Sequence, residues 1–412
     1  MDLKLFSQTL IGQVNIPSSK SITHRALICS SLAHGRSIIH KPLYCEDTQA
    51  TIACLESLGL EISQMANKII VNGKGYFQLV GLLDAKESAT TLRFLIGLIS
   101  YFIPSYSIYV HPQLLKRFVS DDLKALEGLR FSCLENKIEV KGLLTKELKN
   151  LSTNLTSQWV SSQLLALPLV KNKVHSFVLD NEYVKLTASV MKAFGVEIIN
   201  KNNYLIAESK YQASEMTIEV DYSSLAFFLG MALFNPQLLV GPISQNSLQP
   251  DFRIITFFEK MGASFIEVGA YLKLERLEPR DCLLDLSQNP DLAPLLAAVS
   301  SVLGKKVTLT GLSRLKYKES DRLEAIYTTL KTLGANLEIK DNSLVIYGKN
   351  SLKGGVSVDS YRDHRIIMSL AAITNKIDQP FIIRGSEYVV KSFPDFWLKF
   401  TEIGGKYESS LS

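Results

Sequence analysis

One unit of sequence recurs six times along this chain of 412 residues and constrains the fold more than any other feature. Each copy has apolar residues at helical spacing, then a glycine, then two short strand-like runs separated by a turn. The glycines recur at intervals of 67 to 72 residues, at Gly59, Gly128, Gly195, Gly262, Gly334 and Gly404. Because glycine adopts a left-handed conformation without steric strain, we expect each to end its helix. Helix, glycine and strand is a common order, but six copies at nearly constant spacing argue against coincidence.

Each unit is long enough to hold a further strand and a further helix. Residues 17–33 and 90–99 have the apolar pattern of two such additional helices. A chain of 412 residues is too long for one ordinary hydrophobic core. Six units therefore predict two domains of the α/β (α+β) class, with three units in each.

The two ends of the chain are expected to meet in one domain. The sixth unit stops at Gly404 without its closing strands, so we expect residues 3–5 and 12–16 to supply strands to the C-terminal domain. The predicted domains are 15–220, and 221–412 together with 1–14. A cleft between two domains is a usual place for a ligand.

The composition narrows the class of protein. Hydrophobic residues make up 46% and charged residues 21% of the chain, which is typical of a globular protein, and the net charge of +5 is too mild to indicate nucleic-acid binding. Five cysteines without a CxxC pair indicate neither a disulfide framework nor a thiolate metal site. The apolar run 92–103 is too short to span a bilayer, and the N-terminus lacks the apolar core of a signal peptide. We expect a cytoplasmic protein without a membrane segment.

Polar side chains gather where helices are predicted to begin. Ser19, Lys20 and Ser21 precede an apolar run, and Arg25 lies one turn later. Free N–H groups, the positive end of the helix dipole and a guanidinium together favour an anion. The alternative, an ordinary helix cap with surface cations, has equal weight on this stretch alone.

The same character recurs at other predicted helix starts. These are Glu87–Arg93, Ser161–Gln163, Asp291, Lys318–Arg322, Asp363–Arg365 and the stretch around Lys391. Each taken alone is explained by a solvated helix start or a plain cap. His24 and His364 lack HxH or HExxH spacing, so we expect no metal.

Several such helix starts aimed into one cleft would bind a polyanion. Asp291 and Glu319 would then be carboxylates in cationic surroundings, which makes them candidates for proton transfer. The residues by themselves indicate an enzyme that acts on small phosphorylated or carboxylated substrates.

Three motifs carry a resemblance to a known family. The stretches Ser19-Lys20-Ser21-Ile22-Thr23-His24-Arg25, Lys318-Glu319-Ser320-Asp321-Arg322-Leu323 and Asp363-His364-Arg365 resemble, in order and spacing, the 5-enolpyruvylshikimate-3-phosphate synthases, or 3-phosphoshikimate 1-carboxyvinyltransferases. The resemblance covers essentially the whole chain. It implies a two-domain inside-out α/β fold, the enolpyruvyl transferase fold, with three βαβαββ repeats in each domain and the active site in the interdomain cleft.

The resemblance also implies a reaction and the residues that carry it. The family transfers the enolpyruvyl group of phosphoenolpyruvate to the 5-hydroxyl of shikimate 3-phosphate and releases phosphate, a step of chorismate and aromatic amino-acid biosynthesis. The implied catalytic residues are Asp291, Glu319 and Lys20. The implied ligands of shikimate 3-phosphate are Lys20, Ser21, Arg25, Ser161, Ser162, Gln163, Tyr183, Asp291, Arg314 and Lys318. The implied ligands of phosphoenolpyruvate are Lys20, Ala89, Arg117, Gln163, Glu319, Arg322, His364, Arg365 and Lys391. No cofactor, nucleic acid or membrane partner is implied, and we expect a monomer.

Two positions depart from the family pattern. Ala89 stands where the family often has a glycine close to phosphoenolpyruvate and the inhibitor glyphosate, so we expect glyphosate tolerance. Asp180 falls where many members place a serine that binds the shikimate phosphate. A carboxylate about 4 Å from that phosphate would weaken binding by roughly 4 kcal/mol. Arg314, where some members have Asn, is a cation that would compensate.

Two alternatives stay open at this point. The sister enzyme, which transfers enolpyruvate to UDP-N-acetylglucosamine, typically uses a loop cysteine, and residues 109–118 contain none. A catalytically inactive relative that binds anions is the second alternative, and Asp180 is the reason to consider it.

Overall fold

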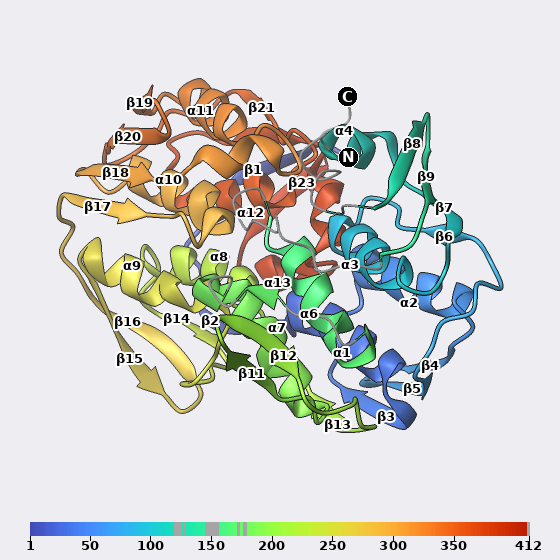
Figure 1. Cartoon of the computed structure of the whole chain (residues 1–412). Helices are drawn as coiled ribbons and strands as arrows, with labels where there is room; N and C mark the ends of the chain where they lie inside the picture. Colours follow the sequence, from blue (N-terminus) through green and yellow to red (C-terminus); the bar gives the residue numbers. More distant parts are fainter. Residues whose placement is uncertain (119–125, 127, 145–155, 171–173, 176–178, 410–412) are drawn as a thin grey trace. The chain divides into compact units, whose positions relative to one another are not determined.

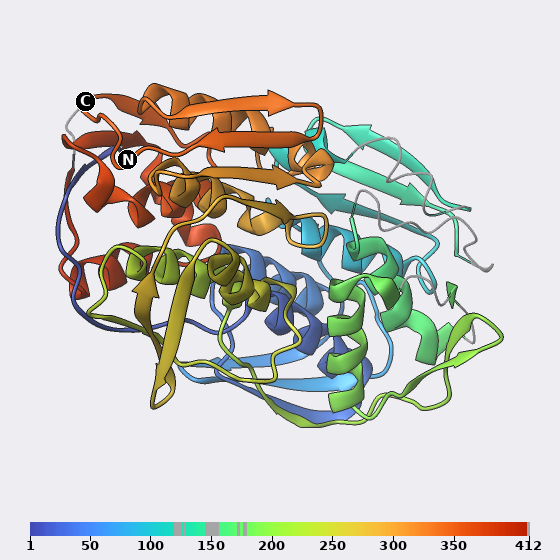
Figure 2. The same cartoon turned by 90° about the vertical axis from the view of Figure 1, so that its left-hand side faces the viewer.

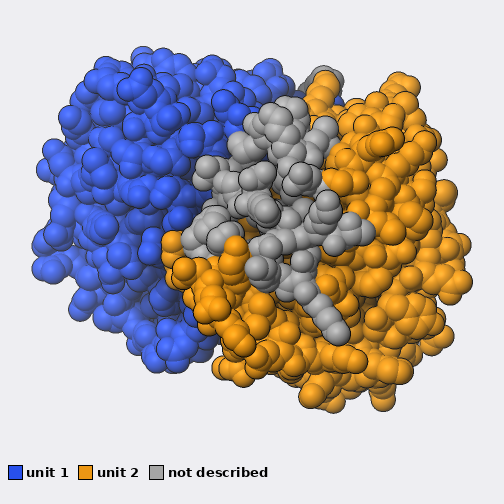
Figure 3. All heavy atoms as spheres, viewed as in Figure 1, with its two compact units in different colours: residues 1–17, 220–412 blue, residues 18–219 orange. Residues whose placement is uncertain are grey.

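The computed structural model describes residues 1–118, 126, 128–144, 156–170, 174–175 and 179–409. The chain divides into two compact units (Figure 3). Unit 1 comprises Met1–Pro17 and Val220–Ser412, and unit 2 comprises Ser18–Glu219. The chain thus passes from unit 1 to unit 2 after Pro17 and returns after Glu219.

The elements follow one another in the order that the repeat predicts (Figure 1). Unit 2 contains α1 (Lys20–Leu32), β3 (His34–His40), α2 (Glu46–Ser57), β4 (Glu61–Met65), β5 (Lys68–Lys74), β6 (Leu83–Asp84), α3 (Ala89–Ile99), β7 (Ser105–Tyr109), α4 (Pro112–Arg117), β8 (Arg130–Leu134), β9 (Lys137–Lys141), α6 (Gln158–Val170), β10 (Val174–His175), α7 (Glu182–Ala193), β11 (Ile198–Lys201), β12 (Tyr204–Ala207) and β13 (Glu215–Thr217). The first half of unit 1 contains β1 (Leu3–Phe6), β2 (Gly12–Asn15), α8 (Tyr222–Ala232), β14 (Leu238–Gly241), η2 (Pro250–Arg253), α9 (Ile254–Lys260), β15 (Ala263–Val268), β16 (Tyr271–Leu277), β17 (Cys282–Asp285), η3 (Pro290–Leu292) and α10 (Ala293–Ser301). The second half contains β18 (Lys306–Thr310), η4 (Ser313–Tyr317), α11 (Arg322–Thr332), β19 (Asn336–Lys340), β20 (Ser343–Tyr347), β21 (Ser357–Asp359), α12 (His364–Ala372), η5 (Thr374–Lys376), β22 (Phe381–Arg384), η6 (Ser386–Lys391), α13 (Phe396–Glu402) and β23 (Lys406–Ser409).

Within the described residues, each unit contains three small sheets. The strand orders are β13-β3-β5-β4, β6-β7-β9-β8 and β10-β12-β11 in unit 2, and β15-β16-β14-β2, β17-β18-β20-β19 and β21-β22-β1-β23 in unit 1. Every four-stranded sheet combines one parallel outer pair, such as β17 with β18, with two antiparallel pairs. The antiparallel pair β15 and β16 runs as a long hairpin, drawn in yellow in Figure 2. The three sheets of unit 1 and two of the sheets of unit 2 therefore share one pairing pattern, whereas the described strands β10, β12 and β11 form two antiparallel pairs only.

Strands from the N-terminus complete the sheets of unit 1, as predicted. β1 lies between β22 and β23 and pairs antiparallel with both, and β2 pairs in parallel with β14. The prediction that the sixth unit lacks both closing strands was wrong in one respect. β23 follows Gly404 and is the first closing strand, so β1 supplies only the second.

The six repeat glycines adopt the predicted backbone conformation. Their φ angles are +84° at Gly59, +103° at Gly128, +78° at Gly195, +104° at Gly262, +85° at Gly334 and +98° at Gly404. Gly262 also meets a steric requirement, because a Cβ there would lie 1.9 Å from the carbonyl oxygen of Glu278. Helix ends of this kind explain why the repeat is marked by glycine rather than by another small residue.

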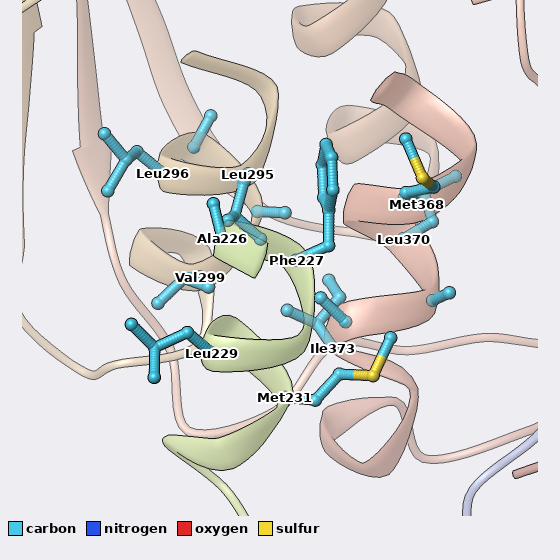
Figure 4. Close-up of a cluster of buried hydrophobic side chains, with 14 of the residues drawn as sticks. Ala226, Phe227, Leu229, Met231, Leu295, Leu296, Val299, Met368, Leu370 and Ile373 are labelled. Atoms are coloured by element: carbon cyan, nitrogen blue, oxygen red, sulfur yellow. The ribbon is translucent and has the colours of Figure 1, made fainter. Parts of the chain in front are cut away.

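The helices at the centre of each unit are buried on all sides. In unit 1, α8, α10 and α12 pack on one another, and Figure 4 shows their side chains meeting, with Phe227, Leu295 and Leu370 among them. All nine residues of α10 are buried, as expected for a helix that is apolar all round. In unit 2, α1, α3 and α6 are buried in the same way. α3 and α6 approach so closely that a Cβ on Gly97 would lie 2.0 Å from Ser162 Oγ.

The sheets cover these helices with one buried face. In β9 and β18, buried side chains alternate with more exposed ones. Central helices flanked by half-exposed sheets make each unit an inside-out α/β structure, as the family resemblance implies. The N-termini of the central helices then become the natural place for a site, since their first N–H groups have no partner within the helix. Across the described part of the chain, no helix is both long and apolar enough to cross a bilayer.

Candidate active site

Arg322, at the start of α11, organises a cluster of charges in unit 1. Its guanidinium is fully buried and contacts three carboxylates, two of which are distant in sequence. Nη1 donates to Asp291 Oδ1 at 2.7 Å, Nε donates to Asp363 Oδ2 at 2.8 Å, and Nη2 donates to Glu319 Oε2. Nη2 also reaches Asp363 Oδ1 at 3.3 Å. Because these acids surround the guanidinium, the pKa of Arg322 is raised above its ordinary value despite burial.

Asp291 lies in η3, directly before the central helix α10, and is paired with three cations. Besides Arg322, Lys318 Nζ lies 3.1 Å from Asp291 Oδ1, and Arg365 Nη2 lies 3.5 Å from Oδ2. Burial by itself would raise the pKa of Asp291, but Arg365, Lys318 and Arg322 outweigh it and hold the pKa well below the usual range. Burial lowers the pKa of Lys318, and Asp291 opposes that shift. Asp291 is therefore an ionised carboxylate at neutral pH.

The start of the central helix α12 adds the third acid. Asp363 caps this helix, because Oδ1 accepts from the N–H of Arg365 at 3.0 Å, and its side chain is fully buried. The hydroxyl of Ser320 donates to Oδ2 at 3.2 Å. One carboxylate thus holds the helix cap, Arg322 and Ser320 together. This explains why the motifs 318–322 and 363–365, which the sequence analysis treated separately, form one cluster.

Asp251 also belongs to this region, and the sequence analysis missed it. It lies in η2 and is 2% exposed. Its carboxylate accepts from Ser223 Oγ at the start of α8 and from Asn289 Nδ2 at 3.3 Å. A single acid after a proline carries no charge pattern that would have indicated its role, and the only hint was its position before a short apolar helix.

The other predicted residues of unit 1 lie at the ends of neighbouring elements. The guanidinium of Arg314, in η4, donates to the carbonyl oxygen of Ser287. His364 is the first residue of α12 and is 1% exposed, and Lys391 ends η6 and is 4% exposed. Arg365 additionally donates to the carbonyl oxygen of Asp291 at 3.3 Å.

Lys20 is the first residue of α1 in unit 2 and forms an ion pair. Ser19 caps the helix by accepting from the N–H of Ile22, at 3.4 Å. Lys20 Nζ lies 2.8 Å from Asp47 Oδ2, in the first turn of α2. The side chains of Lys20 and Asp47 are 17% and 9% exposed, so the pair is largely shielded. Asp47 is not among the site residues predicted from the sequence.

Arg25 lies one turn further along α1 and connects three helices. Nε donates to Thr187 Oγ1 at 2.8 Å, and Nη1 and Nη2 donate to the carbonyl oxygens of Ser21 and Tyr183. Thr187 in turn donates to Ser161 Oγ at 2.9 Å. Burial lowers the pKa of Arg25 to about 10, which still leaves it charged at neutral pH. The predicted residues Ser21, Arg25, Ser161 and Tyr183 are therefore brought together.

Ser162 and Gln163 lie in the contact between α3 and α6. Gln163 Oε1 accepts from the hydroxyl of Tyr101, and Nε2 donates to the carbonyl oxygen of Gly97 at 3.1 Å. Ser162 Oγ donates to the carbonyl oxygen of Trp159 at 2.7 Å within its own helix. Both side chains are thus held by protein groups in this structure.

A chain of buried polar side chains joins helices α1, α2 and α3 of unit 2. His24 Nδ1 lies 2.8 Å from Thr51 Oγ1, and Thr51 Oγ1 lies 2.6 Å from Thr91 Oγ1. Thr91 Oγ1 donates to Ser88 Oγ, the cap of α3, at 2.7 Å and contacts the carbonyl oxygen of Asp47 at 3.3 Å. Burial lowers the pKa of His24 to about 3, so the imidazole is neutral at neutral pH. Sequence reasoning missed this chain because it joins threonines on separate helices.

The remaining predicted residues of unit 2 lie at element ends. Ala89 is the first residue of α3, and Arg117 is the last residue of α4. Asp180 is exposed. Lys185, five residues after Asp180, forms an ion pair with Glu182 at 3.0 Å.

The two clusters differ in what they can do. The unit 1 cluster holds ionised carboxylates beside cations and can accept protons from a substrate. The unit 2 cluster presents Lys20, Arg25 and helix N-termini, which can bind anionic groups. In the described residues, no group of three or more His, Cys, Asp or Glu side chains is placed to hold a metal ion.

The chain is similar to known proteins over nearly its whole length. The model of the family EPSP synthase (3-phosphoshikimate 1-carboxyvinyltransferase) matches residues 6–400. The chain is 34% identical to the 3-phosphoshikimate 1-carboxyvinyltransferase of Clostridioides difficile, with 98% of each chain covered. It is also 34% identical to the enzyme of the same name from Clostridium kluyveri, with 97% of this chain and 96% of that one covered.

Solved structures with this fold are known. The EPSP synthase of Acinetobacter baumannii superposes with a TM-score of 0.79 at 21% identity, with 100% of both chains covered. The enolpyruvyl transferase NikO of Streptomyces tendae superposes with a TM-score of 0.76 at 13% identity, with 100% of this chain and 99% of that one covered. At these identities the likeness shows the fold, which is that of enolpyruvyl transferases.

Proposed function

The chain belongs to the EPSP synthase family, the 3-phosphoshikimate 1-carboxyvinyltransferases, and we propose that its two charged clusters together carry out the enolpyruvyl transfer that this family catalyses. The reaction transfers the enolpyruvyl group of phosphoenolpyruvate to the 5-hydroxyl of shikimate 3-phosphate and releases phosphate. The family match does not favour UDP-N-acetylglucosamine as the acceptor. The observation that supports our assignment of residues most strongly is the grouping of Asp291, Glu319 and Asp363 around one buried arginine.

In this proposal the carboxylates of unit 1 transfer the protons. A proton added to the methylene carbon of phosphoenolpyruvate makes the adjacent carbon electrophilic, and the 5-hydroxyl adds to that carbon as it loses its own proton. The tetrahedral adduct then loses phosphate and a methyl proton. Asp291 and Glu319 are the carboxylates for these transfers, and Asp291 is supported by the three cations that keep it ionised.

The cations of both clusters bind the acidic groups of the substrates. In unit 2, Lys20 and Arg25 lie at the start of a buried helix whose N–H groups also favour anions. Ser21, Ser161, Ser162, Gln163 and Tyr183 are proposed to bind shikimate 3-phosphate with them, together with Lys318 and Arg314 of unit 1. Arg117, Arg322, His364, Arg365 and Lys391 are proposed to bind phosphoenolpyruvate. Such contacts are strong because a closed site excludes water.

Arg322 has two roles in this proposal, because it holds the carboxylates and also binds substrate. Its N–H groups are directed to Asp291, Glu319 and Asp363 in the present structure. We propose that an acidic group of phosphoenolpyruvate replaces one of these carboxylates on Arg322. The displaced carboxylate would then be released for proton transfer, so that substrate binding and activation of the acid are linked.

A coupled assay of phosphate release tests the function. We expect release with phosphoenolpyruvate and shikimate 3-phosphate together, and none with UDP-N-acetylglucosamine as the acceptor. Asp291→Asn removes the charge and the basic group, so kcat should fall by roughly 10²- to 10⁴-fold. Asp378→Asn, at an exposed aspartate, is the matched control and should leave kcat unchanged. Release with neither acceptor would instead identify an anion-binding relative, the alternative that Asp180 raised.

We also propose that the enzyme tolerates glyphosate. Ala89 is half-buried at the start of α3, where the family often has a glycine. An extra methyl in a tight site disfavours a ligand by about 1–3 kcal/mol. Ala89→Gly should therefore lower the inhibition constant of glyphosate, measured in the same assay, by roughly 10- to 100-fold. Strong inhibition of the unmodified enzyme would contradict this proposal.

The cellular setting is part of the same proposal. The substrates are small molecules, and we propose that the enzyme acts as a cytoplasmic monomer without a cofactor. All five cysteines are free thiols, which is in keeping with a reducing compartment. Light scattering coupled to size exclusion would measure the oligomeric state directly.

A further inference from the structure

Asp251 is a buried acid for which the proposed chemistry has no use. It is 2% exposed and lies in η2, between the central helix α8 and the outer helix α9. Ser223 Oγ of α8 donates to Asp251 Oδ2, and Asn289 Nδ2 donates to Oδ1 at 3.3 Å. Both bonds reach the carboxylate oxygens, but the charge is not required for two hydrogen bonds, because an amide oxygen could accept from Asn289 while the amide nitrogen donates to Ser223 Oγ.

Asn289 connects Asp251 to the turn that carries Asp291. Asn289 is fully buried, and its Nδ2 also donates to the carbonyl oxygen of Pro250 at 2.7 Å. Its backbone carbonyl accepts from the N–H of Leu292 at 3.1 Å, which closes the turn around Asp291. The position of Asp291 before α10 therefore depends on a side chain that Asp251 and its neighbour Pro250 hold.

The two carboxylates also interact through their charges. Burial, followed by the charge of Asp291, raises the pKa of Asp251 to about 6, while Arg365 and the bonds from Ser223 and Asn289 oppose the shift. Coulomb interaction is mutual, so an ionised Asp251 must raise the proton affinity of Asp291 in turn. Because Arg322, Lys318 and Arg365 hold the pKa of Asp291 well below the usual range, Asp291 alone is a weak base. The negative charge of Asp251 raises the proton affinity of Asp291 and so makes it a stronger base.

A purely structural role does not account for the charge. Burying an ionised carboxylate without an ion pair is unfavourable, and asparagine or serine would avoid that penalty. Asp251 forms no ion pair within the described residues, although it lies near a site that contains three cations. Its negative charge is thus maintained at a cost to stability, and that cost calls for a functional reason.

We propose that Asp251 is a positioning residue for the transfer reaction, which fixes the turn of Asp291 through Asn289 and strengthens Asp291 as a base by its negative charge. This inference rests on the proposed function, in which Asp291 accepts a proton from the substrate. Asp251 itself contacts neither substrate.

The experiment compares pH profiles of kcat for phosphate release. In the unmodified enzyme, kcat should fall as the pH drops through about 6, since Asp251 then becomes neutral and Asp291 a weaker base. Asp251→Asn keeps the shape but has no charge, and its amide oxygen can accept from Asn289 while its amide nitrogen donates to Ser223 Oγ. Its kcat at pH 8 should be roughly three- to tenfold lower, with both KM values changed less than about twofold, and the acidic fall should disappear.

A second variant separates charge from structure. The bond from Ser223 lowers the pKa of Asp251, so Ser223→Ala should move the acidic fall of kcat to higher pH and leave kcat at pH 8.5 close to that of the unmodified enzyme. Asp378→Asn, at an exposed aspartate, is the control for an unspecific loss of charge. In an Asp291→Asn background, Asp251→Asn should have no further effect on kcat, because the two act in series.

Three results would overturn the inference. They are an Asp251→Asn variant with the unmodified pH profile, a loss of kcat that is equal at every pH, and a loss that adds fully to that of Asp291→Asn. Failure of the unmodified enzyme to release phosphate from its two substrates would instead refute the proposed function, before any variant is tested.

Discussion

The two clusters are built on the same repeated scaffold but hold their polar groups by different means. In unit 1, the starts of α10, α11 and α12 are joined by ion pairs, with Arg322 between three carboxylates. In unit 2, an ion pair between Lys20 and Asp47 joins the starts of α1 and α2, and hydroxyls connect α1, α2 and α3 through Thr51 and Thr91. The scaffold supplies equivalent helix starts, and the side chains placed there decide how far ion pairs or hydroxyls join the helices.

This difference matches the two tasks of the proposed reaction. A proton acceptor must stay ionised in a buried place, which requires compensating cations, as around Asp291. A binding surface for anions needs oriented donors, and neutral hydroxyls can orient them with little dependence on pH. We therefore expect unit 1 to respond strongly to changes of charge, and unit 2 to respond to changes that remove single hydroxyls.

The largest effect is expected at Arg322. Arg322→Ala leaves Asp291, Glu319 and Asp363 facing one another without their shared cation. Breaking buried pairs by removing one partner destabilises a protein by about 3–5 kcal/mol, so the free energy of unfolding should drop by that order at pH 7.5. Urea unfolding followed by circular dichroism would measure the drop, and phosphate release should be abolished.

The pH dependence of the Arg322→Ala effect follows from Asp291. Its pKa is held below the usual range in the folded protein, so the ion pairs stabilise at pH values above the unfolded pKa and lose that effect as the pH falls. The difference between variant and parent should thus shrink toward acidic pH. Arg322→Lys keeps one charge without the planar fork and should fall between the two. A loss below about 1 kcal/mol would show that the cluster is solvated rather than interdependent.

A smaller effect is expected at His24 in unit 2, where the folded protein favours the neutral form of the side chain rather than the charged form. Burial lowers its pKa to about 3 in the folded protein, whereas the unfolded chain binds the proton near pH 6.5. Folding stability should therefore be lost as the pH falls below 6.5, by about 2 kcal/mol at pH 5 from this group alone. His24→Asn should remove that part of the pH dependence of the unfolding free energy. His34→Asn, at an exposed histidine, should not change it, and an unchanged slope in His24→Asn would exclude the buried neutral imidazole.

The comparison also shows which features could be predicted from sequence. The repeat glycines and the strands supplied by residues 3–5 were predictable because a glycine at a helix end and an alternating apolar run are local signals. The helix starts at Ser19 and Asp363 were predictable for the same reason. β23 was missed because it is short and largely exposed, so it lacks a buried alternation.

The partners of the polar side chains could not be predicted. Arg322 was expected to bind a substrate from the family resemblance, but nothing local indicates that residues 291 and 363 supply two of the three carboxylates around it. Asp251 and Asp47 were missed for a similar reason, since their roles depend on side chains that are distant in sequence. Local patterns therefore located the helix starts, whereas the three-dimensional fold determines which side chains meet there.

The smallest effect, and the sharpest test of the contrast, is expected at Thr91. Thr91→Val keeps the shape of the side chain but removes the hydroxyl that contacts Thr51, Ser88 and the carbonyl oxygen of Asp47. The free energy of unfolding should drop by about 1 kcal/mol, and Thr91→Ser should restore most of it because the hydroxyl returns. Thr329→Val in unit 1 removes a hydroxyl that donates to the backbone carbonyl oxygen of Asp359 at 3.4 Å. This substitution should have a smaller effect on the free energy of unfolding.

A double-mutant cycle of Thr91→Val with Thr51→Val then decides whether the hydroxyls act as a chain. The two losses should be less than additive by about 0.5 kcal/mol or more, because each variant already breaks the bond that the two threonines share. The KM of phosphoenolpyruvate should rise with Thr91→Val while kcat changes little, since the chain holds the start of α3, where Ala89 lies. Fully additive losses without a change in KM would mean that these threonines only fill the core. Unit 2 would then lack a connected cluster of hydroxyls comparable to the ion-pair cluster of unit 1.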